Sequence, residues 1–419
     1  MASDSFYAAV DIGSTKTSVI VARLADGDTL KVTGVGYIST AGYSKGMVED
    51  AQRLQSALKV AVEEAYRYLG RDVATNVYAT VSSDAIKCFN SEAEIAGLRS
   101  KGPVGYGEVA KLVASCRPEQ SDRDAVLHVI PIEYEVDGLG GIRNPVGLQA
   151  DQVRVNSHVV VCDTNHVKEI VGVLNGCKLP PRSLVAHSMA SGESVLTEGE
   201  RELGAVLIDM GGGTTDMTIF RSGNPWFSSV IPLGGMDMTS DLAQCLDLPL
   251  DIAEEVKLDW GHAMPQALHP NEQAIIPSID GESEWSISRR SVCQPLHARL
   301  EEVVKLVLLR MQQAGLRHLP PGGLVATGGC AEMPGFEELL RSMVGGPARV
   351  AWPAEIAGMP GELARPAFSA VLGTLMWGAK HQGRSRIYNG NEASWLEKFS
   401  SRRGRRESRE RDFALVNRR

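Results

Sequence analysis

An aspartate, three glycines and two threonines stand between two apolar runs in the stretch AVLIDMGGGTTDMTIF at residues 205–220. This pattern predicts a strand, a tight turn and a second strand. Consecutive glycines let a backbone adopt positive φ and approach a ligand closely, and successive N–H groups in such a turn converge on an anion such as phosphate. The carboxylate of Asp209, at the strand end, suits Mg²⁺ and its waters. The turn residues that would hold phosphate are Gly211, Gly212, Gly213, Thr214 and Thr215.

Residues 7–22, YAAVDIGSTKTSVIVA, repeat this design. The stretch at 205–220 lacks the lysine and helix of a P-loop and the GxGxxG and helix of a dinucleotide fold, and a glycine-rich hairpin is the alternative for this motif alone. Two such cradles indicate a duplicated architecture in which two similar domains face one nucleotide. The pair resembles the phosphate loops of the actin, sugar-kinase and heat-shock-chaperone superfamily. The first cradle consists of Asp11, Gly13, Ser14, Thr15 and Lys16.

Length and composition predict two or more domains with proper cores, because the chain has 419 residues and is 43% hydrophobic. No signal peptide and no apolar run of the ~18 residues that a membrane span needs are evident, so we expect a cytoplasmic chain. The seven cysteines are scattered without CxxC spacing, which indicates neither disulfides nor zinc. The net charge of −8 is uneven, since residues 384–419 carry 11 basic and 5 acidic side chains. We expect no nucleic-acid partner.

In the first half of the chain, apolar spacing predicts a helix that begins at Asp50 and stops at Gly70. Short alternating stretches around one helix at 108–116 predict a small α+β module inserted at 84–163. Further segments read as a strand at 30–39, a strand at 77–81, and helices at 166–177 and 188–197.

In the second half, Glu254 and Lys257 lie one turn apart on a helix at 252–260, where a solvated salt bridge is the simplest interpretation. In residues 233–245, Gly234 and Gly235 precede a helical segment. A long amphipathic helix is predicted from about Pro295 to Gly315. The remaining elements are a hairpin within 275–287, a strand at 324–329 ending in Gly328 and Gly329, and a closing helix after Pro366.

With the cradles placed, the chain resembles the FtsA family of bacterial cell-division proteins over about residues 6–380. The resemblance rests on VDIGSTKT (10–17), KGMVED (45–50), HVIPIEYEVDG with GIRNPVGL (128–148), VLTEGERELGAVLIDMGGGTTD (195–216) and VATGGCAEMPGF (325–336). It implies an α/β, actin-like (ribonuclease-H-like) duplicated fold around a nucleotide cleft, with an SHS2-like subdomain 1C. The implied division is 5–83 and 164–190 for subdomain 1A, 84–163 for 1C, 191–235 and 310–359 for 2A, 236–309 for 2B, 360–381 for a closing helix, 382–393 for a linker and 394–419 for a tail.

The resemblance also implies ATP and Mg²⁺ as cofactors. Asp11 and Asp209 would then approach Mg²⁺ through water, and the two turns would hold the phosphates. No catalytic base can be assigned near 183–192, so we expect slow hydrolysis at most. The residues that would enclose the sugar and base are Gly234, Gly235, Glu254, Lys257, Gly328 and Gly329.

The tail departs from the family expectation of an amphipathic membrane helix, because its apolar face lasts barely two turns. Arg402 to Arg411 favour an anionic lipid surface, although such a run also fits a solvated tail. A second apolar cluster at 413–416 is the other candidate for insertion. The residues that we expect to contact the membrane are Trp395, Leu396 and Phe399.

The function implied by the resemblance is a self-assembling adaptor that tethers the FtsZ ring, through the FtsZ C-terminal peptide, to the cytoplasmic face of the membrane at the septum. It would also recruit later division proteins. A small-molecule kinase of the superfamily would need an aspartate base beside a sugar pocket, which no inserted segment offers. A chaperone would need more than the forty or so residues that follow the nucleotide fold. A PilM-like pilus-assembly adaptor, with the same inserted module, is the nearest alternative.

Overall fold

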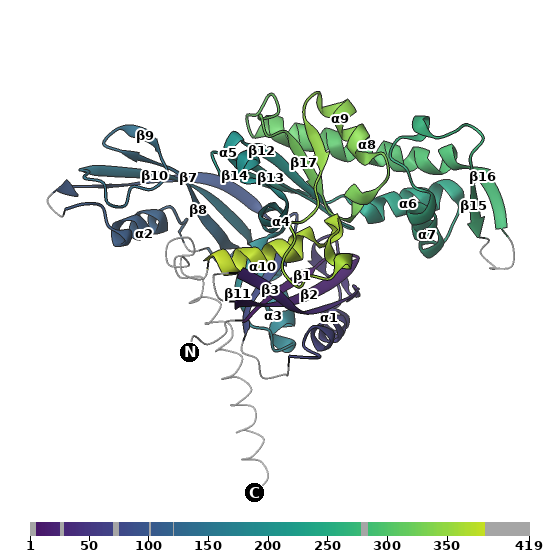
Figure 1. The fold of residues 1–419 in the computed structure, drawn as a ribbon, viewed down its shortest axis with the longest axis horizontal. Coiled ribbons are helices and arrows are strands. Elements are labelled where there is room, and N and C mark those ends of the chain that lie inside the picture. The colour runs from purple at the N-terminus through teal and green to yellow at the C-terminus, as the bar shows by residue number, and fades with distance from the viewer. Residues whose placement is uncertain are drawn as a thin grey trace, which may run out of the picture.

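The computed structural model of the protein describes residues 6–25, 29–69, 75–99, 102–119, 121–277 and 284–381. Two lobes and an inserted module make up these ranges, and the module projects to one side (Figure 1). Across the described ranges, no helix combines the length and the apolar character that a membrane crossing requires. Several expectations lie outside the described residues, namely the helix stop at Gly70, the linker at 382–393 and the tail at 394–419 with Trp395, Leu396 and Phe399.

A five-stranded sheet of order β11-β6-β1-β2-β3 forms the first lobe. β1 pairs with β2 antiparallel and with β6 parallel, so the turn after Ile12 lies at the carboxyl end of the parallel strands. The expected strand, turn and strand at residues 7–22 are therefore confirmed. The strands are β1 (Phe6–Ile12), β2 (Lys16–Ala25), β3 (Thr29–Ser39), β6 (Thr75–Val81) and β11 (Pro181–Ala186), with the short pair β4 (Tyr43–Ser44) and β5 (Met47–Val48) beside them.

Four helices cover the two faces of this sheet. In Figure 1, α10 lies on one side of it, and α1 and α3 lie on the other. Asp50 caps α1 as expected, because its side chain accepts hydrogen bonds from two backbone N–H groups. The helix ends at Ala65, however, four residues before Leu69, the last apolar residue of the predicted helix. The helices are α1 (Ala51–Ala65), α3 (Thr164–Gly176), α4 (His187–Val195) and α10 (Ser369–His381).

The second lobe repeats the first strand for strand, in the order β14-β13-β12-β17-β18. Its first three strands are antiparallel, and β17 and β18 join β12 in parallel. The duplicated fold expected from the two cradles is present. The strands are β12 (Ala205–Met210), β13 (Thr215–Arg221), β14 (Asn224–Ile231), β17 (Leu324–Thr327) and β18 (Ala348–Val350).

The expectation that a long helix begins near Pro295 is wrong, because α8 (Arg289–Gln313) starts six residues earlier. A proline inside a helix costs ~3 kcal/mol or more. Here Val292 and Cys293, both fully buried, anchor the first turns in the core and offset that cost. The other elements of this lobe are α5 (Glu198–Leu203), α6 (Gly235–Leu246), α7 (Leu250–Trp260), α9 (Phe336–Val344) and the hairpin β15 (Gln273–Pro277) with β16 (Glu284–Ser288).

The inserted module is an antiparallel sheet of order β7-β10-β8-β9 with one helix, α2 (Tyr106–Ser115). It has a hydrophobic core of its own. At its base it packs on β14, the edge strand of the second lobe, where His158 lies 3.1 Å from the hydroxyl of Ser228. The module therefore covers a sheet edge that would otherwise be open. Its strands are β7 (Lys87–Ala96), β8 (Asp124–Val136), β9 (Leu139–Ile142) and β10 (Gln152–Asp163).

Candidate functional site

The turn between β1 and β2 and the turn between β12 and β13 face each other across the lobes. Each is closed by the same backbone hydrogen bond: Gly13 N–H donates to Lys16 at 3.0 Å, and Gly211 N–H donates to Thr214 at 2.9 Å. Together they line a cavity of about 190 Å³. The site residues predicted from the sequence that line it are Asp11, Gly13, Ser14, Thr15, Lys16, Asp209, Gly211, Gly212, Gly213, Thr214, Gly328 and Gly329.

The glycines of the second turn are required by close contact with the first. A β-carbon on Gly212 would lie 2.4 Å from Thr15 Cγ2, and one on Gly213 would lie 2.3 Å from Ser14 Oγ. Gly328 is a further tight point, because its φ is +89° and a β-carbon there would lie 2.3 Å from Asp209 Oδ1. Only glycine lets the backbone from both lobes come this close.

The two predicted metal-binding carboxylates are buried at the ends of equivalent strands, β1 and β12. Asp11 accepts a hydrogen bond from Thr80 Oγ1 at 2.6 Å, and Asp209 accepts one from Ser191. Burial raises the pKa of Asp209. Burial acts in the same direction on Asp11, but hydrogen bonds from His187 and Thr80 outweigh it and lower the pKa of that carboxyl.

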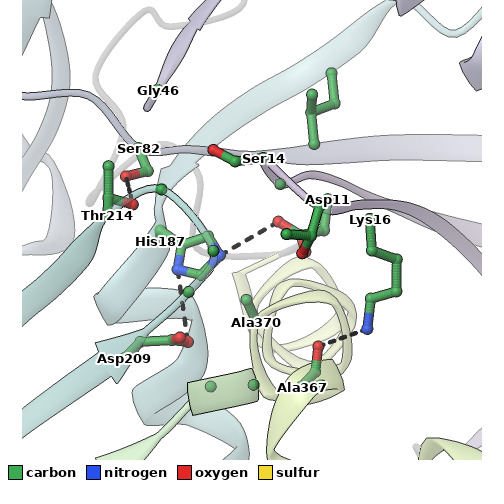
Figure 2. A pocket seen from close by; sticks show the side chains of 18 of the residues that line it. Asp11, Ser14, Lys16, Gly46, Ser82, His187, Asp209, Thr214, Ala367 and Ala370 are labelled. Atoms are coloured by element: carbon green, nitrogen blue, oxygen red, sulfur yellow. Dashed lines mark hydrogen bonds and ion pairs between the residues drawn. The ribbon is translucent and has the colours of Figure 1, made fainter. Parts of the chain in front are cut away.

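His187, the first residue of α4, lies between these two aspartates (Figure 2). Its Nε2 is 3.3 Å from Asp11 Oδ1 and its Nδ1 is 3.5 Å from Asp209 Oδ2. Burial lowers the pKa of His187, but the facing carboxylates of Asp209 and Asp11 more than reverse this and raise it to about 10. At pH 7 the imidazole is therefore protonated, and it lies between the two carboxyl groups. His187 was not among the residues predicted from the sequence, where the one signal for it is a histidine at the junction of a strand and a helix.

A third buried carboxylate, Asp216, lies on β13 opposite Asp209 in the strand register. It accepts hydrogen bonds from Ser82 Oγ at 2.7 Å and Thr214 Oγ1 at 2.9 Å. Burial raises the pKa of Asp216 to about 6. Because Ser82 follows β6, its bond to Asp216 joins the two lobes beside the cavity. Asp216 and Ser82 were not among the predicted site residues.

Lys16 lines the cavity, but its ammonium group points toward the start of α10 (Figure 2). Nζ donates to the Ala367 carbonyl at 2.7 Å and lies 3.1 Å from the centre of the Phe368 ring, a cation–π contact. Burial lowers the pKa of Lys16 to about 8. Side chains that the sequence did not point to complete the lining, namely Ile12, Tyr43, Ala367 and Ala370, together with the backbone at Gly46.

Five predicted ligand residues lie next to the second turn but do not line this cavity. Thr215 is fully buried and donates its hydroxyl to the Leu233 carbonyl. Gly234 and Gly235 pack against the backbone of the turn, where Gly235 N–H donates to Gly211 at 3.0 Å. Lys257 pairs with Glu254 at 2.6 Å. The solvated salt bridge is not what forms, because the Lys257 side chain is only 9% exposed and also donates to the Gly235 carbonyl.

The site thus combines buried carboxylates, hydroxyl groups, a lysine and glycine turns, which are the groups that hold a hydrated divalent cation and a polyphosphate. No group of three or more His, Cys, Asp or Glu side chains that could enclose a metal ion occurs within the described ranges.

Solved structures with the same fold are actin-like proteins. The PilM–PilN type IV pilus biogenesis complex contains a chain with a TM-score of 0.62 and 18% identity, covering 90% of this chain and 98% of that one. MreB5 of Spiroplasma citri bound to AMPPNP has a TM-score of 0.51 and 12% identity, covering 91% and 98%. At these identities the likeness concerns the fold.

Sequence comparison identifies the family. A model of cell division protein FtsA matches residues 206–373, and a model of the SHS2 domain inserted in FtsA matches residues 84–161. Together they cover more than half of the chain. Cell division protein FtsA of Pseudomonas aeruginosa is 29% identical over 388 residues, covering 92% of each chain. That of Escherichia coli K12 is 29% identical over 405 residues, covering 94% of this chain and 96% of its own. The chain belongs to the FtsA family of actin-like cell-division proteins.

Proposed function

We propose that this protein is an ATP-binding adaptor that self-assembles and links the FtsZ ring to the cytoplasmic face of the cell membrane at the division septum. It would also recruit later division proteins. The observation that carries the nucleotide part is the convergence of two equivalent turns, each following a buried aspartate, on one cavity. Two such turns around one cavity fit the phosphates of ATP. MreB5, a neighbour of the same fold, was solved with AMPPNP bound.

The residues fit Mg²⁺ and a polyphosphate. Asp11 and Asp209 would hold a hydrated Mg²⁺ through its waters, and the ion would neutralise phosphate charge. The turns at 13–16 and 211–214 would hold the phosphates, because the glycine backbone leaves the space that side chains would fill. Sites for whole cofactors measure roughly 300–1,000 Å³. The 190 Å³ cavity has room for the phosphates and the ion, so the purine would extend past it, beside Gly234, Gly235, Glu254 and Lys257.

We assign ATP the role of a conformational and assembly ligand, with slow hydrolysis at most. A nucleotide bound between two turns that already touch stabilises the closed arrangement of the lobes. A kinase would need a general base beside a second substrate, and the carboxylates of this cavity already have partners in His187, Ser82 and Thr80. A PilM-like pilus adaptor shares the fold. The match of the chain to two FtsA family models favours the division role.

The partner surfaces are proposed from the sequence. Residues 236–309 would bind the FtsZ C-terminal peptide, and the acidic body of the chain would attract a basic peptide. The tail at 394–419 would contact anionic lipid through Trp395, Leu396 and Phe399 and the arginines that follow. Crosslinks from an FtsZ peptide that fell mainly in residues 84–163 would contradict this assignment.

Sedimentation with anionic liposomes, with and without Mg·ATP, tests the whole proposal. The expected result is sedimentation that increases with ATP and is lost from a chain ending at Asn391. Calorimetry in parallel reports whether ATP binds at all. A chain that binds ATP but ignores liposomes would exclude the tether, and a chain that does not bind ATP would exclude the nucleotide role.

A further inference from the structure

The imidazole of His187 lies where a hydrated cation would have to lie to reach both aspartates. It contacts Asp11 through Nε2 at 3.3 Å and Asp209 through Nδ1 at 3.5 Å. A Mg²⁺ that reaches a carboxylate through water needs roughly 2.1 Å to the water oxygen and then a hydrogen bond of about 2.7 Å. Because the ring already makes close contacts on both sides, the ion and the ring cannot share the space between these carboxylates.

The backbone that carries His187 is fixed on both sides, whereas its side chain borders the cavity. Ala186 N–H donates to the buried His128 Nε2 at 3.0 Å. Ser188 Oγ lies 2.8 Å from Thr218 Oγ1. The His187 side chain is 14% exposed and lines the cavity. Rotation about its two side-chain bonds can therefore move the ring while α4 stays in place.

We propose that His187 controls the affinity of the divalent-cation site. Its imidazole and the metal compete for the Asp11–Asp209 pair, so the metal binds tightly only together with a nucleotide. The inference rests on the proposed function, because it takes this pair as the divalent-cation site. It adds a residue that regulates metal binding at that site. Phosphate oxygens would supply further ligands to an ion at this pair, and the imidazole would then turn away from the carboxylates.

This arrangement has a physical advantage for a protein that must stay folded without its ligand. Two buried carboxylates that face each other without a positive partner repel and are expensive to desolvate. His187 supplies a hydrogen bond to Asp11 and an ion pair to Asp209. Both contacts must be broken before a bare cation can bind, which lowers the affinity for free metal. The affinity for the metal–nucleotide complex would then be set by the phosphates.

Binding of Mn²⁺, followed by electron paramagnetic resonance on the full chain without nucleotide, tests the competition. His187→Ala is expected to bind Mn²⁺ about tenfold more tightly than the wild type, because no hydrogen bonds of the ring need to be broken. His187→Lys is expected to bind it more weakly than the wild type, since an ammonium group would stay between the carboxylates. His187→Ala combined with Asp209→Asn should lose the gain, which assigns the signal to this pair.

A matched control is His166→Ala, which removes a buried histidine from the first turn of α3, outside the cavity, and should leave Mn²⁺ affinity unchanged. Circular dichroism of each variant reports folding, and His187→Gln replaces His187→Ala if the latter does not fold. Unchanged or weaker Mn²⁺ binding in His187→Ala would overturn the competition. The proposed function fails separately, if the wild type takes up no Mn²⁺ even with ATP.

Discussion

Thr15 and Gly212 touch across the two lobes, so closely that a β-carbon on residue 212 would lie 2.4 Å from the Thr15 methyl group. The two turns thus pack on each other as well as lining the cavity. A substitution in one turn should therefore displace the other turn, although almost two hundred residues separate them in the sequence.

We predict that Gly212→Ala holds the turns apart and weakens ATP binding by about tenfold, since forcing an extra methyl group into a packed contact costs ~1–3 kcal/mol. Calorimetry with Mg·ATP measures the loss. Gly199→Ala on α5, where a β-carbon meets no atom within 4 Å, is the matched control and should bind ATP as the wild type does. Equal affinities for the two variants would mean that the turns do not hold the nucleotide between them.

Asp209→Asn should remove the Mg²⁺ dependence of ATP binding and leave the chain folded. The amide keeps the shape of the side chain and can still accept a hydrogen bond from Ser191, whereas the charge that attracts the hydrated ion is lost. Calorimetric titrations of ATP with and without Mg²⁺ would be compared for both proteins, with thermal melting as the check of folding. A folded variant whose ATP affinity still rises with Mg²⁺ to the wild-type extent would exclude Asp209 from the metal site.

The base of the inserted module should lose stability in mild acid. Burial lowers the pKa of His128 and of His158 to about 3. Because the folded-state pKa lies below the unfolded value of about 6.5, the unfolded chain takes up protons first as the pH falls, and the stability present above pH 6.5 is lost below it. At pH 5 the loss is about 2 kcal/mol for each histidine.

Urea denaturation at pH 7 and pH 5 measures this loss. Asp216 changes in the opposite direction, because its pKa of about 6 lies above its ordinary value and its burial becomes less costly in acid. A His158→Gln variant separates the two effects, since Gln can still donate to the nearby Ser228 hydroxyl but does not titrate. The variant should lose less stability between pH 7 and pH 5 than the wild type. An equal loss would show that His158 is protonated in the folded protein.

Local patterns in the sequence predicted both cradles, because each strand, turn and strand is contiguous in the chain. The contacts that require glycine at 212 and 213 come from Ser14 and Thr15 of the other lobe. The duplicated sheet followed from finding the same pattern twice. His187 could not be predicted in this way, since its partners at 11 and 209 reach it only after β11 has joined the first sheet beyond the inserted module. Asp216 is the last residue of the motif at 195–216, but its role depends on Ser82 of the other lobe.

Two other expectations failed for reasons of tertiary packing. Pro295 marks a helix start by local rules, yet α8 extends through it because buried side chains on both sides hold the helix in the core. Glu254 and Lys257 have the spacing of a surface pair. The burial of Lys257 follows from the packing of α7 against the start of α6, where the Gly235 carbonyl accepts from Lys257. Spacing identifies such a pair but does not reveal what covers it.

The last prediction concerns the tail, which lies outside the described residues, and it rests on the sequence. Partial burial of Trp395, Leu396 and Phe399 in a membrane supplies at best a few kcal/mol, at roughly 1.5–3 kcal/mol for a fully buried side chain. The arginines add an attraction to anionic lipid that falls with salt. A single chain should therefore exchange rapidly between membrane and solution.

Assembly changes this balance, because many aligned tails make each later contact effectively intramolecular, and avidity raises binding by ~10² or more without a new contact. Trp395→Glu should release even assembled protein from anionic vesicles, whereas raised salt should release single chains first. Vesicle flotation at several salt concentrations, with ATP to promote assembly, measures both effects. Ser394→Glu is the matched control, since it adds the same charge at the neighbouring position without removing the indole, and should release much less protein. If a chain ending at Asn391 floated as well as the full chain, the tail would have no part in membrane binding.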